Sequence, residues 1–224
     1  LTAQTTFRGQ TLNPAATVSG AALTARNSFL GALSASVSTN DFESFSIGAG
    51  TPLNLNFGFA GNASLNGDGS ISNLATSAGR FATSGTKYWR QQVGPTTSFE
   101  IGFSQAVAGF GFYGTDIGDF NGRLTLEFFD GASLVNSFLV QDGDLSGDER
   151  AELNGNLLFW GVLYGSNSFN RINFVLEGDE DIFGFDDMTV ADARQVIGVP
   201  EPGSVALLLS GLAGLGVVAR RRRA

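Results

Sequence analysis

The sequence predicts an all-β fold: an antiparallel β-sandwich of the jelly-roll type, with one short N-terminal helix and a C-terminal transmembrane helix. Apolar residues alternate with small or polar ones, most clearly in residues 53–59, LNLNFGF. Asn-Gly and Asp-Gly pairs, which suit tight hairpin turns, separate the alternating segments. The 31 Gly and 20 Phe residues among 224 are typical of short strands around an aromatic core.

Further strands are expected wherever the same period of two returns, in residues 99–103, 124–128, 134–140 and 172–176. With their turns they predict about nine or ten short strands. One segment has a different period: in residues 21–33, AALTARNSFLGAL, the apolar residues lie near helical spacing. We expect a short helix there.

Composition divides the chain into four parts. Residues 1–40 hold the short helix, residues 41–190 the β-sandwich, residues 191–199 a linker, and residues 200–224 a C-terminal anchor segment. The chain starts at Leu1, and no basic stretch followed by an apolar one opens it. We therefore expect either that a signal peptide has been removed or that the sequence is a fragment.

The absence of Cys and His excludes several kinds of chemistry. A disulfide framework, a thiolate nucleophile, a His-assisted serine triad and ordinary zinc, haem or iron-sulfur sites all need one of these residues. The charge excludes another partner. Residues 1–199 carry 9 basic and 20 acidic side chains, and such an acidic body repels the phosphates of nucleic acids.

The last residues, 199–224, read VPEPGSVALLLSGLAGLGVVARRRRA and contain 17 consecutive uncharged residues, 203–219. At about 1.5 Å per residue, these 17 give a helix just long enough to span a bilayer. The arginines at the end place the body outside the cytoplasmic membrane, and the prolines keep the preceding stretch extended. A plain single-span anchor or a buried apolar helix is the alternative. The residues involved are Pro200, Glu201 and Pro202, and Arg220, Arg221, Arg222 and Arg223.

This three-part tail resembles the PEP-CTERM sorting domain of exported bacterial proteins. The resemblance implies export through an N-terminal signal peptide, retention by the C-terminal helix, and processing at Pro200-Glu201-Pro202 by an exosortase, a membrane protease. It also implies a Gram-negative host that makes exopolysaccharide. The body would then lie in the cell envelope and become extracellular after processing.

Eleven of the acidic residues lie in two short stretches, 142–152 and 177–187, as in sites that collect oxygen ligands for calcium. In a jelly roll the first and last strands are commonly neighbours, which would bring Glu43 close to Asp186 or Asp187. These three carboxylates are the predicted Ca²⁺ site. The pattern resembles galactose-binding-like sandwiches and related carbohydrate-binding modules, where such residues hold a structural calcium. An ordinary solvated acidic face is the alternative.

Sugar binding by a sandwich usually needs exposed aromatic rings with polar neighbours. Tyr88 and Trp89, followed by Arg-Gln-Gln, supply that mixture, so they are the predicted ligand-binding residues, with core packing as the alternative.

We expect a non-enzymatic envelope or extracellular-matrix protein whose partners are an exosortase and exopolysaccharide. The alternative is a polysaccharide-active hydrolase using two carboxylates. A third possibility is a structural or adhesive protein without a specific ligand. No motif marks a catalytic pair among the available acids, which are Glu43, Glu100, Glu127, Asp116 and Asp119.

Overall fold

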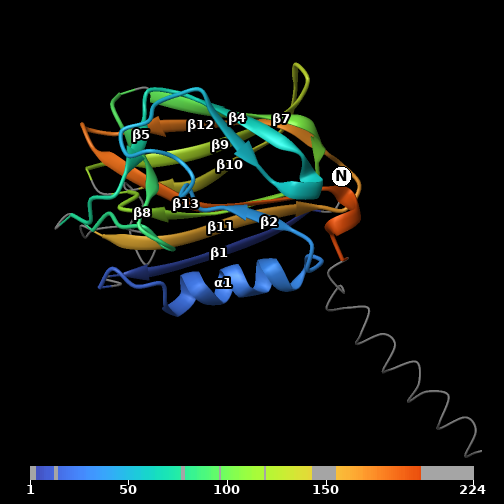
Figure 1. Ribbon diagram of the computed structural model, residues 1–224, viewed down its shortest axis with the longest axis horizontal. Helices are drawn as coiled ribbons and strands as arrows, with labels where there is room; N and C mark the ends of the chain where they lie inside the picture. Colours follow the sequence, from blue (N-terminus) through green and yellow to red (C-terminus); the bar gives the residue numbers. More distant parts are fainter. Residues whose placement is uncertain are drawn as a thin grey trace, which may run out of the picture.

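The computed structural model describes residues 4–12, 15–76, 79–95, 97–118, 120–142 and 155–197. They form two antiparallel β-sheets packed face to face, with one α-helix on the outside (Figure 1). The elements are β1 Gln4–Leu12, α1 Gly20–Gly31, β2 Ser38–Asn40, β3 Leu53–Asn56, the 3₁₀ helix η1 Gly58–Ala60, β4 Asn62–Asn66, β5 Ser70–Ser72, β6 Tyr88–Gln92, β7 Thr97–Val107, β8 Gly109–Thr115, β9 Arg123–Asp130, β10 Ser133–Asp142, β11 Asn156–Tyr164, β12 Phe169–Glu177, β13 Ile182–Ala191 and the 3₁₀ helix η2 Ala193–Gln195.

The two sheets divide the strands almost equally. Within the described residues, one sheet has seven strands in the order β1-β11-β8-β13-β6-β5, with β2 also paired to β13. The other has six strands in the order β10-β9-β12-β7-β4-β3. Neighbouring strands run antiparallel throughout. The prediction of an antiparallel β fold with one short N-terminal helix is therefore confirmed.

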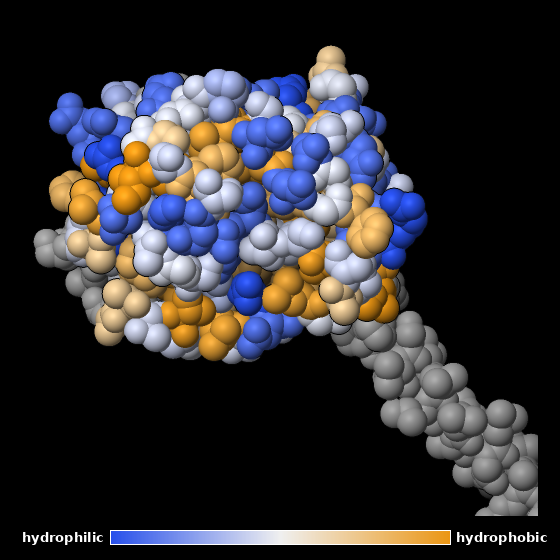
Figure 2. Space-filling model, in the orientation of Figure 1, coloured by the Kyte–Doolittle hydropathy of each residue, from blue (hydrophilic) through white to orange (hydrophobic). Residues whose placement is uncertain are grey.

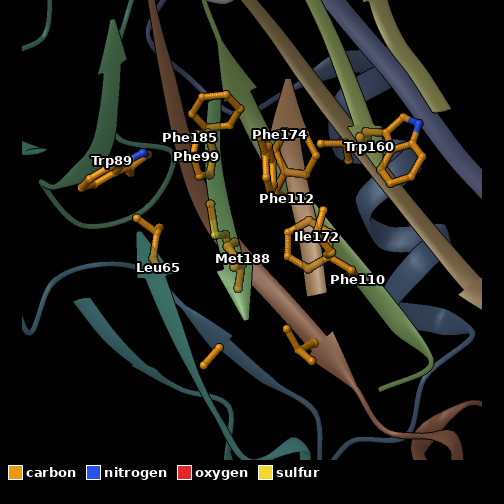
Figure 3. Close-up of a cluster of buried hydrophobic side chains, with 14 of the residues drawn as sticks. Leu65, Trp89, Phe99, Phe110, Phe112, Trp160, Ile172, Phe174, Phe185 and Met188 are labelled. Atoms are coloured by element: carbon orange, nitrogen blue, oxygen red, sulfur yellow. The ribbon is translucent and has the colours of Figure 1, made fainter. Parts of the chain in front are cut away.

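An aromatic core fills the space between the sheets, because every second residue of each strand faces inward. Phe99 of β7 stacks on Phe174 of β12, with ring centroids 4.1 Å apart, and Phe185 of β13 meets both rings edge-on. Figure 3 shows these rings together with Phe112 and Trp160. Residues from both sheets thus make one continuous core.

Helix α1 covers the outer face of the seven-stranded sheet, over β1 and β11 (Figure 1). Its Phe29 is fully buried and packs against Phe7 and Phe159, each with ring centroids 5.6 Å away. Glycines make room for it: a Cβ at Gly161 would lie 2.9 Å from Phe29 Cδ2. The helix therefore forms a second, smaller hydrophobic cluster outside the sandwich.

Two elements differ from the sequence prediction. Residues 4–12 form strand β1 along the whole of β11, so the strand region begins well before residue 41. The alternating segment 53–59 does not continue as one strand. Strand β3 ends at Asn56, because Gly58, with φ of +56°, starts a 3₁₀ turn that leaves Phe59 72% exposed.

The predicted transmembrane helix, residues 203–219, lies outside the described residues. Within the part of the chain that the structure describes, no helix has both the length and the hydropathy to cross a membrane.

Candidate functional site

The three predicted calcium ligands lie around one segment, residues 83–87, which leads into β6. Glu43 comes from the loop after β2, and Asp186 and Asp187 from the middle of β13. Each accepts hydrogen bonds from this segment. The three acids thus share this segment as a source of hydrogen-bond donors, and their predicted role as calcium ligands remains a prediction. We call Glu43, Asp186, Asp187 and residues 83–87 the carboxylate clamp.

Asp186 is the most deeply engaged of the three, with only 1% of its surface exposed. Its Oδ2 accepts the backbone N–H of Thr83 at 2.7 Å and that of Ser84 at 3.3 Å, and its Oδ1 accepts the N–H of Asp187 at 2.7 Å. A β-bulge between β13 and β8 makes this possible, since the register shifts between Asp186 and Thr189. Asp187 itself has a φ of +48°, which a non-glycine residue rarely adopts.

The neighbouring acids are held mainly by backbone N–H and hydroxyl groups. Asp187 accepts the hydroxyl of Ser84 at 2.6 Å. Glu43 Oε1 accepts the backbone N–H of Thr86 at 2.6 Å and that of Lys87 at 2.5 Å. The Lys87 ammonium group donates in turn to the carbonyl of Glu43 at 2.7 Å. The segment is thus tied to both flanking elements by charge-assisted hydrogen bonds.

The pKa values of two clamp acids shift in opposite directions. Burial, reinforced by the adjacent charge of Asp187, raises the pKa of Asp186 to about 8. The backbone N–H of Thr86 is the main cause that lowers the pKa of Glu43. Glu43 is therefore held as a carboxylate, whereas Asp186 binds its proton at unusually high pH.

The clamp does not fit the predicted calcium site well. All six of its carboxylate oxygens already accept hydrogen bonds, several from backbone N–H groups that cannot turn away. Among the described residues, no three acidic side chains are grouped so that they could share a metal ion. A cation would have to displace these donors, which disfavours calcium binding at the clamp, and the predicted site is left to experiment.

The predicted ligand-binding aromatics, Tyr88 and Trp89, are both buried, with exposures of 1% and 0%. Trp89 faces the space between the sheets and packs near Phe99 (Figure 3). Tyr88 lies against Gly184 of β13, where a Cβ would come within 3.2 Å of its ring, and its hydroxyl donates to the carbonyl of Leu74 at 2.8 Å. Neither ring offers a face for stacking on a sugar, which corrects that prediction in favour of core packing.

The acids considered for hydrolysis lie in different parts of the fold, except that Glu100 and Glu127 share the outer face of the six-stranded sheet. Asp116 pairs with Arg80 at a buried position, while Glu100 pairs with Arg171 at 2.9 Å on the outer face of the six-stranded sheet. Glu127 accepts the side-chain amide of Asn173 at 3.1 Å on that same face. Asp119 lies outside the described residues.

Three sets of predicted residues cannot be placed. The sorting motif, Pro200-Glu201-Pro202, and the arginines 220–223 lie outside the described residues, as do residues 143–152 of the first acidic stretch.

Sequence reasoning missed a cleft at the end of the sandwich. It has a volume of about 290 Å³ and is lined by Asp68, residues 91–95, Thr97 and Glu180. We call it the end cleft. The Asn-Gly-Asp-Gly turn and the second acidic stretch were both visible as sequence features, but only the fold places them together.

The fold is similar to several solved structures, and the C-terminal residues match one known sequence motif. A cleaved adhesin domain of Lys-gingipain is 11% identical, covering 69% of this chain and 97% of that one with a TM-score of 0.46. The mannohexaose complex of Caldicellulosiruptor saccharolyticus CBM27-1 is 11% identical, covering 69% and 96%, with a TM-score of 0.39. The family 22 carbohydrate-binding module of Clostridium thermocellum Xyn10B is 13% identical, covering 71% and 96%, with a TM-score of 0.37.

These values are too low for any ligand of those proteins to be transferred to this chain, and no curated protein matches its sequence. The motif match is more direct, because it falls on the residues that the sequence had indicated. Residues 198–223, which hold the Pro-Glu-Pro, the apolar stretch and the arginines, match the PEP-CTERM protein-sorting motif. The chain therefore carries a PEP-CTERM sorting motif, which indicates an exported protein of the cell envelope.

Proposed function

We propose that this chain is a non-enzymatic protein of the cell envelope or extracellular matrix, sorted and cleaved through its PEP-CTERM tail, whose β-sandwich binds exopolysaccharide. The observation that carries the proposal is the match of residues 198–223 to the sorting motif. An exosortase is the processing partner, and Pro200-Glu201-Pro202 is its recognition sequence. The host is a Gram-negative bacterium, and the body becomes extracellular once the tail is removed.

The geometry of the described body is compatible with binding. Figure 2 shows hydrophilic residues over much of one face, with hydrophobic groups scattered between them rather than joined in one broad patch. The clamp acids serve as hydrogen-bond acceptors for the body's own backbone, which supports a structural role for them. The end cleft supplies a polar concave surface of the kind that recognises small ligands.

The sorting part is tested on protein recovered from its native host. We expect a mature mass that ends near Pro200, and recovery outside the cell. Replacement of Pro200, Glu201 and Pro202 by Ala should leave the full-length form in the membrane fraction, whereas the control Glu177→Ala should be processed normally. An unchanged mature mass in the triple variant would contradict sorting through this motif.

A hydrolase is the second candidate, favoured by one observation. Glu100 of β7 and Glu127 of β9 both lie opposite Asn173 of β12, so they stand in one row on the same sheet face. Strands two apart are separated by roughly 10 Å, close to the carboxylate separation of inverting glycosidases. New reducing ends released from a polysaccharide, and lost in Glu100→Gln and Glu127→Gln, would establish this activity in place of simple binding.

A further inference from the structure

The end cleft lies between the two sheets where β6 ends. Asp68 lies on the turn between β4 and β5, Glu180 on the turn between β12 and β13, and residues 91–95 connect β6 toward β7. The backbone N–H of Val93 donates to the carbonyl of Asp181 at 2.8 Å and so ties two of these segments together. The walls of the cleft are therefore built from both sheets.

Glycines fix the turn that carries Asp68. A Cβ at Gly67 would lie 2.5 Å from Phe99 Cβ, and one at Gly69 would lie 2.3 Å from the Trp89 ring. Both contacts are shorter than side chains tolerate, so only glycine lets this turn lie against β6 and β7. The turn holds Asp68 at the cleft, exposed to solvent.

The cleft contains a buried acceptor that lacks a donor. Gln91 is 1% exposed, and its Nε2 donates to the carbonyl of Gln92 at 3.1 Å. Its Oε1 has no hydrogen-bond partner among the described residues. Leaving a buried oxygen without a donor costs about 1–3 kcal/mol of free energy. A ligand that donates a hydrogen bond to Gln91 Oε1 would recover part of that cost.

The other polar groups of the cleft define what kind of ligand it suits. Asp68 and Glu180 accept hydrogen bonds but cannot donate when ionised, and the Thr97 hydroxyl donates to the carbonyl of Leu176. The ligand must therefore supply several donors. A uronic acid or phosphate would be repelled by the two carboxylates, whereas the hydroxyl groups of a neutral sugar match them.

An exposed aromatic residue, Phe120, lies on a turn whose backbone accepts a hydrogen bond from Asp179, next to Glu180 of the cleft. Gly178 lies between the cleft residue Val93 and the turn that carries Phe120. A Cβ added at Gly178 would be 3.4 Å from Val93 Cγ1 and 3.4 Å from the carbonyl oxygen of Phe120. Phe120 is 61% exposed, and its φ of +49° is an outlier for a bulky residue. Strain of this kind is often retained where a side chain must be presented to a ligand.

The cleft lies far along β13 from the point where the chain leaves the sandwich. Glu180 precedes β13, whereas the chain continues toward the sorting motif from the other end of that strand. The ten residues of β13 separate the two points by about 30 Å. The cleft and the end of the described chain therefore lie toward opposite ends of β13.

We infer that the end cleft binds a neutral, hydroxyl-rich sugar unit of a polysaccharide, with Asp68, Glu180 and Gln91 accepting its hydroxyl hydrogens and Phe120 at its rim. This inference rests on the proposed function and names the class of sugar and its site.

The test uses the full chain, purified in mild detergent, on an array of neutral, amino-sugar and uronic-acid oligosaccharides. The wild type should prefer neutral glycans. Asp68→Asn and Glu180→Gln should each weaken the best interaction about tenfold, and Phe120→Ala about fivefold. The matched control Asp130→Asn, which removes an exposed carboxylate from the C-terminal end of β9, should bind like the wild type.

Gln91→Met separates binding from folding. Methionine keeps the size of the side chain and removes the unpaired oxygen, so the melting temperature should stay the same or rise while sugar binding falls. Equal binding by the wild type and the Gln91, Asp68 and Glu180 variants would overturn the site, as would loss of binding in Asp130→Asn alone. Preference for uronic-acid glycans would overturn the sugar class. Overturning the site or the sugar class would still leave the proposal of polysaccharide binding intact. Failure of the wild type to bind any glycan, including exopolysaccharide from its host, would refute the proposed function itself.

Discussion

Two groups of acidic side chains flank strand β6, and they differ in what faces them. In the carboxylate clamp, before β6, backbone N–H and hydroxyl groups of the protein already donate to every carboxylate oxygen. In the end cleft, after β6, Asp68 and Glu180 are exposed, and Gln91 holds an oxygen to which no described residue donates. Acidic residues in a sequence therefore mark a ligand site only where the fold has not already supplied their partners.

The largest expected effect is on the free energy of unfolding, which should respond to substitution in the clamp but hardly to substitution in the cleft. Asp186→Ala should lower the free energy of unfolding by about 3 kcal/mol, because the backbone N–H groups of Thr83, Ser84 and Asp187 lose their acceptor inside the protein. Asp68→Ala, at the exposed cleft, should change it by less than about 0.5 kcal/mol. Urea denaturation of the full chain measures both. Similar losses for the two variants would remove the distinction between clamp and cleft.

A pH effect should come next, and it also belongs to the clamp. The pKa of Asp186 is raised to about 8 in the folded protein by burial and by Asp187, while an unfolded Asp titrates near pH 4. Between these values the native state binds more protons than the unfolded state, so stability falls as pH rises from 4 to 8. The chain has no His to mask this fall.

The melting temperature should therefore be several degrees lower at pH 8 than at pH 5. Asp186→Asn should flatten this dependence, whereas Asp41→Asn, at an exposed position, should not. A wild-type melting temperature that rises between pH 5 and pH 8 would show that Asp186 is ionised normally.

A smaller loss is expected at the outer side of the clamp. Glu43→Gln keeps one oxygen for the N–H groups of Thr86 and Lys87 but removes the charge that strengthens these bonds. The free energy of unfolding should fall by about 1 kcal/mol at neutral pH. Because the pKa of Glu43 is lowered in the folded state, this difference should shrink as pH falls and the wild-type carboxylate becomes protonated. A difference that grows at low pH would contradict the assignment.

The periodic parts of this fold could be predicted from sequence, and the partners of its polar groups could not. Alternation placed Phe99 and Phe174 on inward faces, and helical spacing placed Phe29 on the buried side of α1. The sequence left open whether Trp89 packs in the core or binds a ligand, because a Tyr-Trp pair beside Arg and Gln has no period of its own. The structure shows that both faces of β6 are buried at Tyr88 and Trp89. The end cleft escaped prediction because Asp68, Gln91 and Glu180 are far apart in the chain and meet only through sheet pairing.

The smallest expected effect is that of calcium on the clamp. A cation there would have to replace hydrogen bonds from Thr83, Ser84 and Thr86, so we expect the full chain to melt at the same temperature in EDTA and in millimolar calcium. A ligand that binds only the folded state must stabilise it, by about 2.7 kcal/mol when its concentration is a hundred times its dissociation constant. A rise in melting temperature with calcium that disappears in Asp187→Asn would place a metal site at the clamp. The contrast between clamp and cleft would then fail, because the carboxylates of the clamp would serve a ligand as well as the backbone around them.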